Sequence, residues 1–148
     1  MDELVRWLGE QLDQEEAAAY AAGHLLTGHL ALKWEATGSH VWPQEQVEGV
    51  QAKRVVAGDL MEEMPGYEVA RARALHIAEH DPDRVMGEID AKRQIVRWHY
   101  RRPAPKWDTP KAEGFECATC DQQFPCKTLR LLALPYADRP GYREGWRP

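Results

Sequence analysis

The residues best suited to chemistry are three cysteines within ten positions near the C-terminus. Cys117 and Cys120 form a C-x₂-C pair, Cys126 follows shortly after, and the chain has no other cysteine. Two intervening residues let both sulfurs of a pair face one point, and a third thiol at short range is typical of a tetrahedral metal site. The sequence therefore predicts a zinc ion bound by Cys117, Cys120 and Cys126.

A fourth ligand is needed, because structural zinc normally takes four, and the chain has six histidines. We choose His99, which ends a long predicted helix on its apolar side and is followed by a proline-rich segment that can bring the cysteines back to it. His80 is the alternative. Three cysteines and one histidine leave no free coordination position, so the predicted zinc is structural. No catalytic residue is predicted, and the sequence favours a protein that is not an enzyme.

A second set of metal-binding residue types is His76-Ile77-Ala78-Glu79-His80. It matches the H-x-x-E-H pattern of inverted zinc proteases, in which two histidines share a metal and the glutamate acts as a base. Matches of five residues recur by chance, and His80 directly precedes a predicted helix break. A zinc-dependent hydrolase that uses His76, Glu79 and His80 is therefore an alternative and not the preferred function.

Basic and aromatic side chains are interleaved in residues 97–111. The candidate anion-binding residues are Arg97, Arg101, Arg102 and Lys106. Arginines among aromatics can hold phosphate and stack on bases, so a nucleic-acid-binding or regulatory protein is the other alternative. The whole chain, however, has 24 acidic and 19 basic residues and a formal charge of −5. This balance disfavours a general nucleic-acid binder.

The elements that must position these residues indicate an α+β fold. Leu4, Leu8 and Leu12 recur at helical spacing, and they predict an N-terminal helix over residues 3–22 after the N-cap Asp2. Alternating and β-branched residues then predict a small antiparallel meander, with strands at 30–35, 41–42 and 54–57.

Two further helices are predicted at 68–80 and from Pro82 to about Tyr100. They meet at Asp81-Pro82, where Asp81 is the N-cap and Pro82 takes the first helical position. Residues 101–116 are rich in proline and polar residues, so a loop is predicted to lead into the cysteines. A short apolar helix should follow at 128–134, ended or kinked by Pro135.

We expect a single domain over residues 1–148, in which 101–148 form a zinc-stabilised C-terminal subregion. The sequence has no apolar run long enough for a membrane span and no basic, apolar leader, so we predict a cytoplasmic protein without membrane contact. In a reducing compartment, clustered thiols favour metal over disulfides. The preferred function is a non-catalytic binding or accessory module whose partner is another protein or a second copy of the chain, with nucleic acid less favoured.

Three stretches resemble a family of small, uncharacterised actinobacterial proteins, found also in their phages, that carries a domain-of-unknown-function label. The stretches are 76–85, 91–96 and, most specifically, 128–148, with the sequence Thr-Leu-Arg-Leu-Leu-Ala-Leu-Pro-Tyr-Ala-Asp-Arg-Pro-Gly-Tyr-Arg-Glu-Gly-Trp-Arg-Pro. The family often has a basic residue at the position of Glu79, which further disfavours the hydrolase. The resemblance implies no activity.

Overall fold

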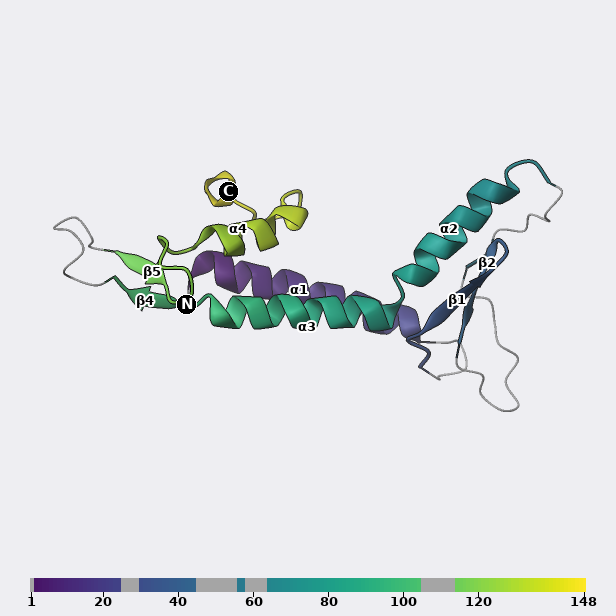
Figure 1. The fold of residues 1–148 in the computed structure, drawn as a ribbon, viewed down its shortest axis with the longest axis horizontal. Helices are drawn as coiled ribbons and strands as arrows, with labels where there is room; N and C mark the ends of the chain where they lie inside the picture. The colour runs from purple at the N-terminus through teal and green to yellow at the C-terminus, as the bar shows by residue number, and fades with distance from the viewer. Residues whose placement is uncertain (1, 25–29, 45–55, 58–63, 105–113) are drawn as a thin grey trace. The chain divides into compact units, whose positions relative to one another are not determined.

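The computed structural model describes residues 2–24, 30–44, 56–57, 64–104 and 114–148 (Figure 1). Its helices and short strands form the predicted α+β fold. The chain divides into two compact units, which we call unit 1 (Met1–Gln14 with Ile89–Pro148) and unit 2 (Glu15–Glu88). Each is described separately, and the single domain stays a prediction. No helix in the described part of the chain has both the length and the apolar character that a membrane crossing requires.

The elements follow one another in an order close to the predicted one. The helices are α1 (Glu3–Gly23), α2 (Tyr67–Glu79), α3 (Pro82–Trp98) and α4 (Lys127–Ala133), with 3₁₀ turns at Leu134–Tyr136 and Glu144–Trp146. The strands are β1 (Trp34–Thr37), β2 (His40–Pro43), β3 (Val56–Ala57), β4 (Arg101–Pro103) and β5 (Phe115–Cys117).

Unit 2 contains the predicted antiparallel meander, in the order β1-β2-β3. Trp34 pairs with Pro43 and Thr37 with His40 across the first hairpin. Helix α2 packs against β1 and β2, and Val41 of β2 and Ala74 of α2 are buried (Figure 1). An isolated hairpin is marginal in water, so the helix supplies the second layer that the sheet needs. Arg54 and Val55, predicted as part of the third strand, lie outside the described residues.

The predicted start of the first strand, at Leu30, is wrong, because β1 begins at Trp34. The backbone of Ala31 and Leu32 bonds to helix ends instead of a neighbouring strand. Ala31 N–H donates to the Gly23 carbonyl at 2.8 Å, and the Leu32 carbonyl accepts from Asp83 N–H at 3.1 Å. Apolar residues do alternate from Leu30, but the tertiary hydrogen bonds of Ala31 and Leu32 take the place of strand pairing there.

The predicted N-cap of α3 is confirmed. Asp81 Oδ1 accepts a hydrogen bond from Arg84 N–H at 2.9 Å, and Pro82 is the first helical residue. The second carboxylate oxygen, Oδ2, accepts from Trp34 N–H at 3.2 Å. Asp81 therefore caps α3 and also fixes the first residue of β1 to the start of that helix.

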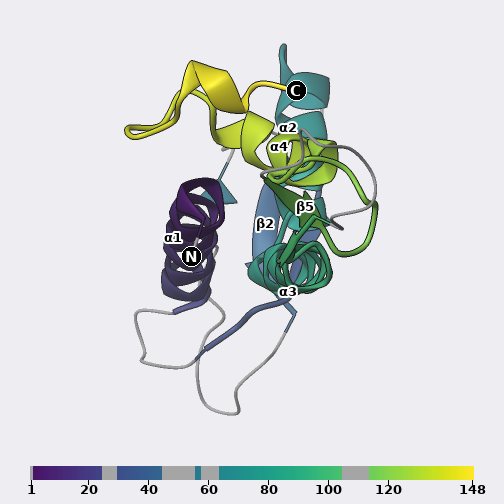
Figure 2. The same cartoon turned by 90° about the vertical axis from the view of Figure 1, so that its left-hand side faces the viewer.

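The C-terminal part of α3 runs antiparallel to the N-terminal part of α1 in unit 1 (Figures 1 and 2). Arg93 donates to Asp13 at 2.7 Å between them. The predicted apolar face of α1 is confirmed, because Leu4, Leu8 and Leu12 are buried. Ile89, Leu129 and Tyr136 complete the largest buried side chains of this core apart from two cysteines.

The C-terminal segment after α4 returns to α1. Trp7 Nε1–H donates to the Pro140 carbonyl at 3.0 Å, and the Trp7 ring packs against Tyr142 and Trp146 with centroids 5.6 and 5.4 Å away. Arg143 also pairs with Glu3. Gly141 has φ +86°, and a Cβ placed there would lie 2.9 Å from Trp7 Nε1. A glycine is therefore required for the segment to lie this close to α1.

Replacing Asp81 with alanine should destabilise the fold, because the change removes the α3 cap and leaves Trp34 N–H without its acceptor. We expect a loss of about 1–2 kcal/mol in the free energy of unfolding. Chemical denaturation measures it, and Asp90→Ala is the matched control, since the exposed Asp90 carboxylate makes only a surface ion pair with Arg93. Equal stability of the two variants would contradict the role given to Asp81.

Gly141→Ala should cost about 1–2 kcal/mol, because alanine is strained at this φ and its methyl group meets Trp7. Gly145→Ala is the control, since a Cβ at Gly145 meets nothing within 4 Å. Thermal melting followed by tryptophan fluorescence compares them. If both variants melt like the original protein, the contact between Trp7 and Gly141 is not what holds the segment.

Candidate metal centre

A short antiparallel ribbon presents the cysteines, where the sequence predicted only a loop. Arg101 pairs with Cys117, Arg102 with Glu116 and Pro103 with Phe115. The ribbon also shortens α3, which ends at Trp98 and not near Tyr100, because the Tyr100 carbonyl accepts from Ala118 N–H at 2.9 Å. The loop prediction is therefore wrong at both ends, and residues 105–113 between the strands lie outside the described part.

The turn after β5 brings the C-x₂-C pair together. Asp121 N–H donates to the Cys117 carbonyl at 3.0 Å, and Cys117 N–H donates to the Gln122 carbonyl at 2.8 Å. Asp121 has φ +53°, a left-handed conformation that aspartate tolerates better than most residues. Cys126 lies at the N-cap of α4, next to the helix start as predicted.

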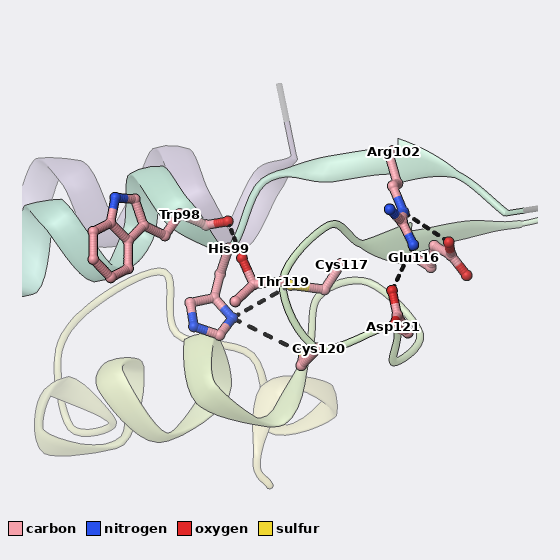
Figure 3. A network of polar contacts seen from close by, with 8 residues as sticks. All are labelled: Trp98, His99, Arg102, Glu116, Cys117, Thr119, Cys120 and Asp121. Carbon is pink, nitrogen blue, oxygen red and sulfur yellow. Dashed lines mark hydrogen bonds and ion pairs between the residues drawn. The ribbon is translucent and has the colours of Figure 1, made fainter.

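The side chains of these cysteines converge on His99, which directly follows α3. His99 Nδ1 lies 3.3 Å from Cys117 Sγ, 3.9 Å from Cys120 Sγ and 3.4 Å from Cys126 Sγ. All four ligand atoms lie within 4.8 Å of one another. Figure 3 shows Nδ1 facing Cys117 and Cys120. We call Cys117, Cys120, Cys126 and His99 the Cys₃His group.

These distances can be compared with those that a tetrahedral zinc ion imposes. Bond lengths of about 2.3 Å to sulfur and about 2.0 Å to nitrogen place each sulfur about 3.5 Å from the nitrogen. The three observed distances lie on both sides of this value. Two of the cysteines are buried, and Cys120 and His99 are half-buried. The Cys₃His group therefore fits a four-coordinate metal ion without rearrangement of its elements.

The protonation of the thiols also favours a cation. Burial acts to raise the pKa of Cys117, but backbone hydrogen bonds from Thr119 and Cys120, together with the thiols of Cys120 and Cys126, outweigh it, and the pKa lies below its usual value. At Cys120, burial and the neighbouring thiols of Cys117 and Cys126 raise the pKa to about 11. The surroundings thus lower the pKa of the Cys117 thiol and raise that of the Cys120 thiol beside it. A divalent ion would remove this penalty by neutralising the charge.

A set of polar contacts holds the cysteine turn in place (Figure 3). Arg102 donates to Glu116 at 2.8 Å and to Asp121 at 2.5 Å, which links β4, β5 and the turn. The Glu116 hydrogen bond is the main reason why the pKa of Arg102 is raised. The Thr119 hydroxyl donates to the Trp98 carbonyl at the end of α3. The turn is thus bound to the helix that ends at His99.

Thr119, Glu116 and Asp121 in this network were missed by the sequence analysis. Their roles depend on the pairing of two three-residue strands separated by a long connection, and such strands are too short to show a period-two pattern. One signal was available: an aspartate directly after the second cysteine is a typical residue for a tight turn.

The four candidate anion-binding residues have different surroundings. Arg102 already binds two carboxylates of its own chain. The Arg101 guanidinium lies over the Phe115 ring, 3.1 Å from its centroid. Arg97 is exposed at the end of α3, and Lys106 lies outside the described residues. Arg97 and Arg101 therefore remain as candidate anion-binding residues, and both lie close to His99 of the Cys₃His group.

The H-x-x-E-H residues form a separate, exposed group in unit 2. Ligand atoms of His76, Glu79 and His80 lie within 4.8 Å of one another at the end of α2. His80 Nδ1 lies 2.8 Å from the His76 carbonyl, and this contact requires a proton on Nδ1. His80 therefore satisfies a carbonyl at the C-terminus of α2, and the Cys₃His group does not include it.

The fold and the site define a small α+β protein with a closed set of three cysteines and one histidine. The chain belongs to the family DUF6221, a family of unknown function whose model matches residues 1–148. This confirms the resemblance to an uncharacterised family. No curated protein and no solved structure matches the chain.

Metal binding at pH 7 should release at least one proton per ion, because Cys120 is protonated in the metal-free protein and must ionise to bind. Affinity should therefore fall as the pH falls. Calorimetric titration with Zn²⁺ in buffers of different ionisation heat counts the protons, and the matched variant His76→Ala, which keeps all four ligands, should release the same number. An observed heat that does not depend on the buffer would contradict this protonation state.

Proposed function

We propose that this protein is a non-catalytic binding or accessory module in which one zinc ion, bound by Cys117, Cys120, Cys126 and His99, has a structural role. The single observation that carries the proposal is the convergence of three sulfurs on His99 Nδ1 at 3.3–3.9 Å. Four protein ligands leave no coordination position for water or substrate, which separates structural from catalytic zinc sites.

The role of the zinc would be to join elements that are too short to be stable separately. Strands β4 and β5 have three residues each and α4 has seven, whereas isolated helices of fewer than about 12 residues and isolated hairpins are marginal in water. The ion would cross-link the end of α3, the ribbon and the start of α4. Residues 101–148 would then be a zinc-stabilised subregion of a single domain.

The proposal extends to the protein's setting. The clustered free thiols and the absence of an apolar span in the described residues support a cytoplasmic location. The C-terminal pattern LRLLALPYADxPGYRExWRP, at residues 129–148, supports an actinobacterial or phage source. For a non-catalytic module, the partner is another protein or a second copy of the chain.

The structural zinc is favoured over the hydrolase by the surroundings of the two histidine groups. His76, Glu79 and His80 are exposed and come from one helix end, and the His80 ring already bonds to the backbone. A hydrolytic zinc site needs a further ligand and a sheltered position for water. These features support His80 as a helix-terminating residue.

Elemental analysis of the purified protein should find one zinc ion per chain. Chelation should lower the melting temperature by at least about 10 °C, because structural zinc binding is itself folding free energy. Cys120→Ser should lose the metal, and the matched variant His76→Ala should keep it. A metal-free protein whose melt is unchanged by chelator overturns the proposal, and metal loss in His76→Ala alone supports the hydrolase.

The fourth ligand is tested by cobalt. Co²⁺ bound by His99→Gln should lose the intense tetrahedral absorption of the original protein, since one nitrogen ligand is gone. His80→Gln, the matched variant, should retain it. The reverse result would assign the fourth position to His80.

A further inference from the structure

A cavity of about 390 Å³ lies beside the Cys₃His group, entirely within unit 1. Its lining comes from the start of α1, the end of α3, β4 and β5, and the loop that carries Phe124. These segments are separate in sequence, and Figure 1 shows the N-terminus of α1 near the junction of α3 with β4. The volume is within the range of small-molecule sites, about 300–1,000 Å³.

The walls combine apolar surface with two cations. Val5, Val96 and Phe124 contribute apolar side chains, and Phe115 keeps 45% of its surface exposed. Arg97 and Arg101 also line the cavity, and among the described residues no carboxylate pairs with either. The Arg101 guanidinium lies over the Phe115 ring with its central carbon 3.1 Å from the ring centroid, and its N–H groups form a planar fork. A planar fork of this kind matches a carboxylate.

We infer that this cavity binds a small aromatic carboxylate, with its rings against the apolar walls and its anionic group on Arg97 and Arg101. A cavity of about 150 Å³ holds benzene, so the volume at this site has room for two fused rings and a carboxylate. Among the described residues, Asp2 is the one acidic side chain in the wall. Its charge disfavours a dianion such as phosphate, and the chain's charge of −5 disfavours a nucleic acid.

The site extends the proposed function and rests on it, because His99 belongs both to the cavity wall and to the Cys₃His group. A bound metal would fix the His99 ring and, through it, the wall between α3 and the cysteine turn. The ligand site should therefore require the zinc-loaded protein.

The test is calorimetric titration of the full-length, zinc-loaded protein with 2-naphthoate, with the neutral 2-naphthalenemethanol as the comparison ligand. We expect saturable binding of naphthoate with a Kd below about 1 mM, and binding of the alcohol about tenfold weaker. Arg97→Gln should weaken naphthoate about tenfold, and Val96→Trp, which fills the cavity, should abolish binding. The matched controls Arg147→Gln and Leu131→Trp, both outside the cavity lining, should bind like the original protein.

Zinc content and melting temperature are measured on every sample, so loss of the metal is distinguished from loss of the ligand site. A zinc-loaded, folded protein that binds no naphthoate overturns the inference while the structural zinc stands. Equal binding of acid and alcohol, or unchanged binding by Arg97→Gln and Val96→Trp, also overturns it. A third outcome also overturns it: naphthoate does not bind, an oligothymidylate binds tightly, and Arg97→Gln abolishes that binding. This result would assign the surface to single-stranded nucleic acid.

Discussion

The constraint on which unit 1 depends is the convergence of three buried or half-buried thiols on one imidazole nitrogen. Thiolates this close repel one another, and burial, followed by the neighbouring thiols of Cys117 and Cys126, raises the pKa of Cys120. Protonated, the four side chains make only weak sulfur hydrogen bonds. A divalent ion bound by all four side chains would cross-link the segments that carry them through four coordination bonds. The same four residues would thus destabilise the protein without a metal and stabilise it with one bound.

A second set of contacts holds unit 1 without any metal. The C-terminal segment lies on α1 through Trp7, Pro140 and the rings of Tyr142 and Trp146. Trp7 is buried and the other two rings are half-buried, and aromatic pairs of this kind add to the stability that burial gives. The stretch at 128–148, which is the most specific part of the family resemblance, therefore has a packing role in the structure. Its particular residues do not by themselves indicate a catalytic function.

Much of the fold and of the site could be predicted from the sequence because the signals were local. Asp81-Pro82 marks a helix start, because Asp81 caps the helix and Pro82 fits its first position. The C-x₂-C spacing indicates a turn in which both sulfurs face one point. The β4–β5 ribbon could not be predicted, since three-residue strands acquire stability only from pairing across a long connection. Leu30 was misassigned for a related reason: its alternating pattern was local, whereas the hydrogen bonds of Ala31 and Leu32 run to distant helix ends. Residues whose partners are distant in sequence, such as Arg102 and Glu116, leave no local signal.

The position of His99 would give a bound metal a consequence beyond stability. One imidazole has its Nδ1 among the sulfurs and also forms part of a cavity wall. If the bound metal strengthens the binding of a ligand in the cavity, thermodynamic linkage requires that the ligand strengthen metal binding by the same factor. The coupling needs no movement of distant elements, because the two sites share a side chain. A metal ion that makes no contact with the small molecule in the cavity could therefore still change the affinity of the cavity for that molecule.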